Sequence, residues 1–203
     1  MERGPKLDER AAVARAQRGD TEAYGTLVRQ HEQVAFRAAY LIVRDEAEAM
    51  DVAQEAFLRA YRSLARFDAA RAFRPWLLRI VTNLAINCVR SARRRDAVSE
   101  RYERNQSIHG QLPSPEATAE AAEQAQRVWT AVRALKPDDQ TLLYLRYFLD
   151  ASEEETATVL GRPKGTVKSR LHRALRRLRD VIENEYPDLA PMQAERRLVG
   201  GAP

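Results

Sequence analysis

Residues that build catalytic and metal-binding sites are scarce in this sequence. Its 203 residues include one cysteine, and the three histidines, His31, His109 and His172, lie far apart with no cysteine or carboxylate at metal-ligand spacing. A phosphate-binding P-loop, a dinucleotide glycine fingerprint and a nucleophile elbow are absent, and eight glycines leave little material for a phosphate cradle. We therefore predict no enzyme activity, no catalytic residues, no metal site and no cofactor.

The single cysteine and the lack of long apolar runs indicate the cellular compartment. Cys88 has no second cysteine for an internal disulfide, and it falls on an apolar helix face, where a buried and inert thiol is expected. No apolar run approaches the roughly 18 residues of a membrane-spanning helix, and Met1–Arg10 has no apolar signal core. These features predict a cytoplasmic protein.

Acidic and basic residues are nearly balanced in number but segregated along the chain. The 34 Lys and Arg residues and 29 Asp and Glu residues give a formal net charge of +5, which understates the local fields because the basic residues cluster. With 44% hydrophobic residues and no internal repeat, the chain suits one mid-sized domain or two small ones. An anionic partner is indicated.

The segment 152–179 has the pattern of a helix-turn-helix. Ser152 and Glu155 form a capping box that begins a short helix, Gly161 can end it in the left-handed conformation, and Pro163 suits the first turn of the next helix. In that second helix one stripe is apolar and predicted to be buried. It consists of Val167, Leu171, Ala174, Leu175 and Leu178.

The remaining faces of the second helix are strongly basic. From Gly161 to Arg179 there are eight basic residues and no acid, which gives a field of one sign suited to phosphate. The stretch G-x-P-x-G-T-V-K-S-R-L-H-R-A, Gly161–Ala174, resembles the promoter-upstream-element reader of bacterial sigma factors, in particular the extracytoplasmic-function group. On its own, a basic helix-turn-helix would equally suit a response-regulator output domain. The candidate residues for upstream-element binding are Lys164, Thr166, Lys168, Ser169, Arg170, His172, Arg173, Arg176 and Arg177.

The N-terminal part of the chain is predicted to form helices at 8–18, 21–43 and 46–64. The third has an apolar stripe of Met50, Ala53, Phe57, Tyr61 and Leu64 and begins with five acids and no base between Asp45 and Glu55. The helix dipole explains acids in the first turn but not Asp51 and Glu55, which lie further in. The run DVAQEAFLRAY, 51–61, resembles the sigma-factor surface that docks on the clamp helices of core RNA polymerase. The resemblance makes Asp51, Gln54, Glu55 and Arg59 the candidate polymerase-binding residues; a plain solvated face is the alternative.

A second basic helix is predicted at 71–95, with seven arginines and no acid. Its apolar stripe is Phe73, Leu77, Ile80, Val81, Leu84 and Cys88, which leaves Arg79, Asn83, Asn87, Arg90 and Arg94 on the other face. Asn can pair with base edges and Arg can hold phosphates. The segment resembles the family's promoter-melting and minus-ten region. The resulting candidates are Phe67, Asp68, Arg71, Arg74, Trp76, Arg79, Asn83, Asn87 and Arg90, where Phe67, Asp68 and Arg71 rest on resemblance alone and Trp76 suits base stacking or the core equally.

Composition divides the chain into four parts. We predict an N-terminal domain at 1–96, a flexible linker at 97–115, a helix-turn-helix domain at 116–186 and a disordered tail at 187–203. In the family the linker threads into the polymerase, whereas a passive tether would have the same composition. Ala151 and Thr156 are less apolar than the family pattern, which predicts looser packing under the first helix of the motif.

These observations predict an all-α protein with two small helical domains joined by a flexible linker. The resemblance implies an extracytoplasmic-function sigma factor whose partners are core RNA polymerase, through its clamp helices and flap, promoter DNA and an anti-sigma factor. The alternative is a helix-turn-helix regulator that binds duplex DNA without polymerase. That alternative leaves the 51–61 match and the Asn83 and Asn87 face unexplained. A DNA-translocating enzyme is a second alternative, but it would need a nucleotide or metal site, and the sequence shows neither.

Overall fold

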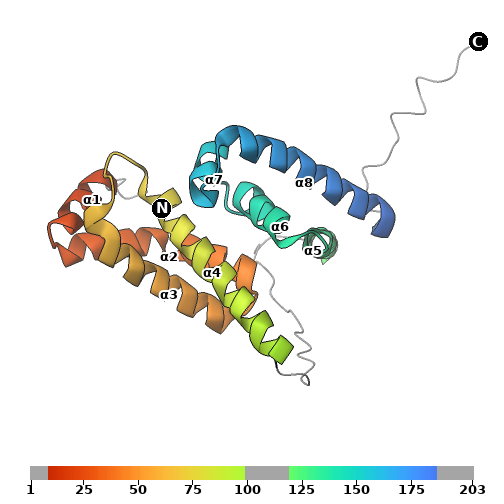
Figure 1. The fold of residues 1–203 in the computed structure, drawn as a ribbon, viewed down its shortest axis with the longest axis horizontal. Helices are drawn as coiled ribbons and strands as arrows, with labels where there is room; N and C mark the ends of the chain where they lie inside the picture. The colour runs from red at the N-terminus through yellow and green to blue at the C-terminus, as the bar shows by residue number, and fades with distance from the viewer. Residues whose placement is uncertain (1–8, 99–118, 187–203) are drawn as a thin grey trace, which may run out of the picture. The chain divides into compact units, whose positions relative to one another are not determined.

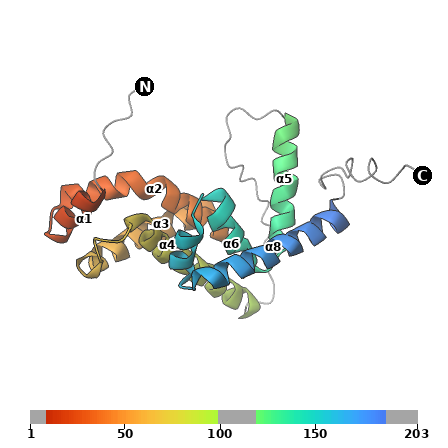
Figure 2. The ribbon, with the colours of Figure 1, turned by 90° about the horizontal axis from the view of Figure 1, so that it is seen from above.

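The computed structural model describes residues 9–98 and 119–186, and every regular element within these ranges is a helix (Figure 1, Figure 2). The α-helices are α1 (Glu9–Gln17), α2 (Thr21–Val43), α3 (Glu46–Ser63), α4 (Phe73–Val98), α5 (Ala119–Arg133), α6 (Pro137–Leu143), α7 (Glu153–Leu160) and α8 (Lys164–Glu185). A 3₁₀ turn, Leu64–Arg66, follows α3, and a π-helical turn, Tyr144–Phe148, follows α6. The predicted all-α fold is confirmed. The predicted linker from residue 99 onward and the predicted tail lie outside the described residues.

Short acidic side chains begin two of the N-terminal helices. The Asp20 carboxylate accepts a hydrogen bond from the Ala23 amide at 2.9 Å in front of α2, and Asp45 accepts one from the Glu48 amide at 2.8 Å in front of α3. Each satisfies an amide that has no partner within its own helix. Arg44, with φ of 64°, turns the chain sharply between α2 and α3. The predicted starts of both helices are therefore confirmed.

The chain forms two compact units. Among the described residues, one contains 9–98 together with 144–164, and the other contains 119–143 together with 165–186. The first unit thus includes α7 beside α1–α4, whereas the sequence-based boundaries assign 116–186 to one module. Those boundaries remain a prediction.

The core of the first unit is formed by α2, α3 and α4, which pack against one another (Figure 1). The buried face of α3 consists of Ala49, Val52, Ala53, Ala56, Phe57 and Ala60. The predicted stripe was wrong at Met50 and Tyr61, which are 47% and 43% exposed. Four alanines let α3 approach its neighbours closely, so the small residues and not the largest ones mark its buried side.

Burial along α4 declines toward its C-terminal half. Phe73, Leu77 and Val81 are fully buried, whereas Leu84 is only half-buried. Cys88, predicted to be buried, is also half-buried, and its Sγ lies 3.7 Å from Glu48 Oε2. The expectation of a fully enclosed thiol is therefore wrong, because Cys88 lies four turns beyond the best-packed start of the helix.

The second unit buries apolar side chains of α5, α6 and α8. They are Trp129, Ala131, Val132, Leu142, Leu143, Val167, Leu171 and Ala174. The predicted stripe of α8 holds over its first three turns but is wrong at Leu175, which is 37% exposed, and Leu178 is half-buried. The later turns of this 22-residue helix are less covered than its start.

Candidate nucleic-acid and polymerase interfaces

The predicted capping box begins α7. The Ser152 amide donates to Glu155 Oε2 at 2.8 Å, and the Glu155 amide donates to Ser152 Oγ at 3.1 Å. At the other end Gly161 adopts φ of 60°, and the Arg162 amide donates to the Ala157 carbonyl at 3.0 Å. This is the left-handed helix ending that a glycine permits without strain. The local geometry of helix, turn and second helix therefore follows the sequence prediction.

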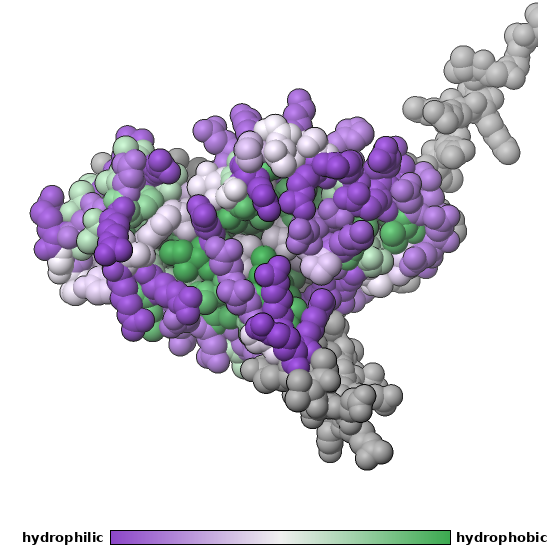
Figure 3. Space-filling model, in the orientation of Figure 1, coloured by the Kyte–Doolittle hydropathy of each residue, from purple (hydrophilic) through white to green (hydrophobic). Residues whose placement is uncertain are grey.

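Most of the predicted upstream-element residues are exposed on α8. This group comprises Lys164, Thr166, Lys168, Ser169, His172, Arg173 and Arg176. Hydrophilic side chains cover most of α8 in the space-filling view (Figure 3). A long helix with several exposed cations and no acid before Asp180 can approach a polyanion without like-charge repulsion.

Two predicted upstream-element residues differ from the others because they are partly buried and paired. Arg170 Nη2 lies 2.9 Å from Asp138 Oδ2. Arg177 binds Asp139 with two hydrogen bonds, Nε to Oδ2 at 2.8 Å and Nη2 to Oδ1 at 2.9 Å. Both arginines therefore have carboxylate partners from α6.

The exposed row predicted on α4 is present. Arg79, Asn83, Asn87 and Arg90 are all exposed, and the row contains no acidic side chain. Four-residue spacing between 79, 83 and 87 places these side chains on one face of the helix. The face therefore offers amide groups for base edges beside guanidinium groups for phosphates.

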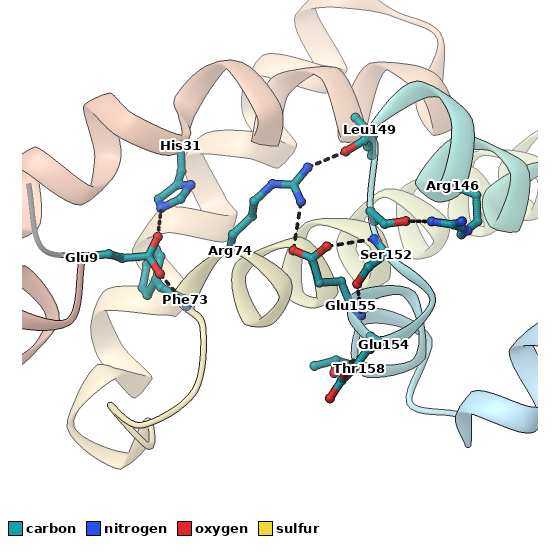
Figure 4. A network of polar contacts seen from close by, with 11 residues as sticks. Glu9, His31, Phe73, Arg74, Arg146, Leu149, Ser152, Glu154, Glu155 and Thr158 are labelled. Carbon is teal, nitrogen blue, oxygen red and sulfur yellow. Dashed lines mark hydrogen bonds and ion pairs between the residues drawn. The ribbon is translucent and has the colours of Figure 1, made fainter. Parts of the chain in front are cut away.

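Arg74 does not share this exposed row. Its guanidinium lies 3.1 Å from Glu155 Oε1 and donates to the Leu149 carbonyl (Figure 4). Glu155 thus accepts from both Arg74 and the Ser152 amide. In this structure Arg74 joins α4 to α7 within the first unit.

Three aromatic residues cluster at the start of α4. The Phe67 and Trp76 rings are 4.6 Å apart, and both rings contact Phe73, which is fully buried as predicted. Phe67 is 8% exposed and Trp76 is half-buried. Of the aromatic candidates for base capture, Trp76 is therefore the more accessible. Asp68 and Arg71, in the loop before α4, are exposed and form an ion pair at 3.3 Å.

A polar contact that the sequence analysis missed fixes the first residue of α4. Glu9 Oε1 accepts from the Phe73 amide at 3.0 Å, and Glu9 Oε2 lies 3.0 Å from Nε2 of buried His31 (Figure 4). The His31 hydrogen bond lowers the pKa of the Glu9 carboxyl, burial opposes this shift, and the Phe73 amide adds to it. His31 and Phe73 lie 22 and 64 positions from Glu9 in the sequence, so no local sequence pattern indicated this contact.

The predicted polymerase-binding face of α3 combines charged and polar side chains with exposed apolar ones. Asp51 and Gln54 are exposed, and Glu55 pairs with Arg59 at 2.6 Å. Met50 and Leu58, four residues to either side of Gln54, are 47% and 52% exposed. Exposed apolar side chains beside acids are typical of a protein-binding surface. Sequence analysis missed the apolar part because it placed Met50 in the core.

Across the described ranges, no three His, Cys, Asp or Glu side chains come together as a metal site would require. None of the described helices is long and apolar enough to cross a bilayer.

Two family models match the chain, Sigma-70 region 2 over residues 27–95 and Sigma-70 region 4 over residues 125–178. The RNA polymerase sigma-H factor of Pseudomonas aeruginosa is 39% identical over 168 residues, which cover 80% of this chain and 87% of the relative. The ECF RNA polymerase sigma-E factor of Escherichia coli K12 is 33% identical over 193 residues, 91% of this chain and 97% of the relative. The chain belongs to the extracytoplasmic-function (ECF) sigma factors. Such a factor acts in transcription initiation with RNA polymerase and is not an enzyme.

Among solved structures, that of CnrH in complex with the cytosolic domain of CnrY is similar to this ECF sigma factor. The TM-score is 0.63 at 26% identity, and the match covers 87% of this chain and 98% of CnrH. Membership explains the segments that a lone helix-turn-helix regulator left unexplained, because the region 2 match includes both 51–61 and the Asn83 and Asn87 face.

Proposed function

We propose that this ECF sigma factor binds polymerase and DNA through three separate helix faces. The acidic and apolar face of α3 binds core polymerase, the Asn and Arg face of α4 reads the minus-ten element, and the basic face of α8 reads the upstream element. The polymerase is thereby placed on a promoter, and the unpaired minus-ten strand is captured beside α4.

The observation that best supports this proposal is the exposed row on α4. Asn83 and Asn87 are one turn apart and lie between Arg79 and Arg90. An exposed amide on a helix has no structural requirement, whereas its paired donor and acceptor suit base edges. Half-buried Trp76 lies at the start of the same helix, and stacking of an unpaired base on an aromatic ring is worth roughly 1 to 3 kcal/mol.

The support for docking through α3 is the combination of charge and exposed apolar area. Asp51 and Glu55 give the face a field opposite to that of the DNA-reading helices, which keeps it free of phosphate. Met50 and Leu58 supply apolar contact area that water would otherwise cover. We assign Asp51, Gln54, Glu55 and Arg59 to this interface together with these two apolar residues.

For α8, Lys168 and Arg173 are the first choices for guanine edges, since Arg and Lys suit the O6 and N7 acceptors of guanine. Arg176 lies further along the helix, where phosphate contact is expected. We further propose that the protein works in the cytoplasm and is held inactive by an anti-sigma factor. Family membership motivates this partner, and CnrH, the similar protein of known structure, is itself bound to the cytosolic domain of another protein.

Run-off transcription tests the proposal. Purified core polymerase is supplied with a promoter library, with and without this protein. The expected result is transcription that depends on the protein and on both promoter elements. Transcription from all sequences alike, or none above core alone, would contradict it.

A further inference from the structure

The two arginines of α8 that have α6 partners are not equivalent. Asp139 has a side chain only 6% exposed and binds Arg177 through both of its oxygens. Asp138 has a side chain 70% exposed and contacts Arg170 through a single oxygen. Neighbouring residues of α6 therefore make two different contacts: a buried carboxylate, Asp139, binds an arginine that is 43% exposed through two bonds, and an exposed carboxylate, Asp138, binds one through a single bond.

The pair of Arg177 and Asp139 is geometrically demanding. A guanidinium that forms two parallel hydrogen bonds with a carboxylate fixes the plane and the distance of both groups. Asp139 lies in the first turn of α6, and removing its partner would leave a carboxylate buried without compensation. Arg177 lies next to Leu178 at the edge of the buried stripe of α8. The contact thus restrains both the rotation of α8 about its axis and its displacement along that axis.

We propose that Arg177 is a positioning residue held by Asp139, and that this pair sets the register in which Lys168, Ser169, His172 and Arg173 meet the bases of the upstream element. This inference rests on the proposed function of α8. It replaces, for Arg177, the direct contact with upstream-element DNA that the sequence analysis assigned to it, because the Nε and Nη2 donors of its guanidinium are already bound to a carboxylate.

Register matters because base-edge contacts tolerate little displacement, whereas contacts to phosphate tolerate more. A loosened α8 would keep its charges and so keep its sequence-independent, salt-dependent attraction to DNA. It would lose discrimination between bases. If Arg177 instead contacted phosphate, removal of its charge would have the opposite effect: the salt dependence of binding would fall and the base preference would stay unchanged.

The test uses the full chain in holoenzyme with purified core polymerase on a library that varies only the upstream element, at two salt concentrations. Asp139→Asn removes no cation from α8. It is nevertheless expected to lower the ratio of transcription from preferred to scrambled elements about tenfold, the size expected when one interaction between contacting residues is lost. Asp138→Asn, the matched control, removes the same charge one residue away and is expected to keep the wild-type ratio.

Arg177→Lys covers the case in which Asp139→Asn fails to fold. It keeps the positive charge but loses the fork, so it is expected to lower the preference ratio while the salt dependence stays as in wild type. Wild-type preference in Arg177→Lys, or in a folded Asp139→Asn, would overturn the positioning role. If Arg173→Ala in parallel leaves the preference unchanged, the failure lies instead in the proposed function of α8.

Discussion

Thr156 places a hydroxyl in the interior of the first unit. Its side chain is fully buried, and within the described part of the chain Oγ1 has no hydrogen-bond partner. Burial of an unsatisfied polar group destabilises a fold, and valine has nearly the same shape. Looser packing under α7 stays a prediction, whereas the structure shows a buried hydroxyl without a partner at Thr156.

Thr156→Val is expected to raise the free energy of unfolding by about 1 kcal/mol, because it removes a buried hydroxyl that gains no hydrogen bond. Urea unfolding measures the change. Thr158→Val is the control, since Thr158 is exposed and its hydroxyl donates to the Glu154 carbonyl at 3.1 Å. An equal gain in both variants would show that helix propensity or apolarity, and not the buried hydroxyl, is responsible.

Glu9 makes the anchoring of α4 dependent on pH. Its pKa is lowered from the ordinary 4.5, mainly by the hydrogen bond with His31. Since the folded pKa lies below the unfolded one, the stabilisation is complete above pH 4.5 and is lost as the pH falls through the folded pKa. Glu9→Gln should therefore cost about 1 to 2 kcal/mol near neutral pH and less in acid.

Urea unfolding of wild type and Glu9→Gln at several pH values checks this expectation. The difference between them should shrink as the pH is lowered below 4.5. Glu32→Gln, an exposed mid-helix position on α2, should follow wild type throughout. A difference between wild type and Glu9→Gln that does not vary with pH would contradict the assigned role of the carboxylate.

At the scale of the element, α3 joins a buried alanine face to an acidic and apolar outer face. Reversing both acids, Asp51→Lys with Glu55→Lys, should weaken binding to core polymerase by at least about tenfold, because charge complementarity guides and holds such interfaces. Affinity for immobilised core polymerase is the measurement, and Glu22→Lys with Glu32→Lys on α2 is the control of equal charge change. Wild-type affinity in the α3 double variant would refute docking through this face.

Helix starts and ends could be predicted from the sequence because their determinants are local. The Ser152 capping box and Gly161 act within a few residues of their position, and each was predicted correctly. The buried face of a helix was harder to predict from the sequence, because it depends on the neighbouring helices. Met50 and Leu175 are apolar and at helical spacing, yet no partner helix covers them fully.

The same distinction applies to the candidate site. The exposed residues of α4 and α8 followed from periodicity, since a helix buries one stripe and leaves the rest in water. The pairing of Arg74 with Glu155 and of Arg177 with Asp139 joins residues 81 and 38 positions apart. A charge pattern alone cannot distinguish an arginine that awaits a phosphate from one that already holds a carboxylate.

For the whole molecule, the proposed function assigns the binding of a protein and the binding of DNA to surfaces of different charge. Within the first unit α3 presents acids and exposed apolar groups, while α4 presents Asn and Arg side chains. The acids of α3 repel DNA phosphate, which favours binding of DNA at α4. The proposed function therefore predicts that polymerase binding and minus-ten reading can be lost independently.

The most direct test of the account is minus-ten preference in holoenzyme carrying Asn83→Ala or Asn87→Ala. Run-off transcription across a library of minus-ten sequences should show preference relaxed by roughly 1 to 3 kcal/mol at the bases that each amide contacts. Arg93→Ala, at an exposed position further along α4, should instead lower transcription from all sequences alike. Asn variants whose preference profiles run parallel to wild type would show that the exposed face of α4 does not read the promoter.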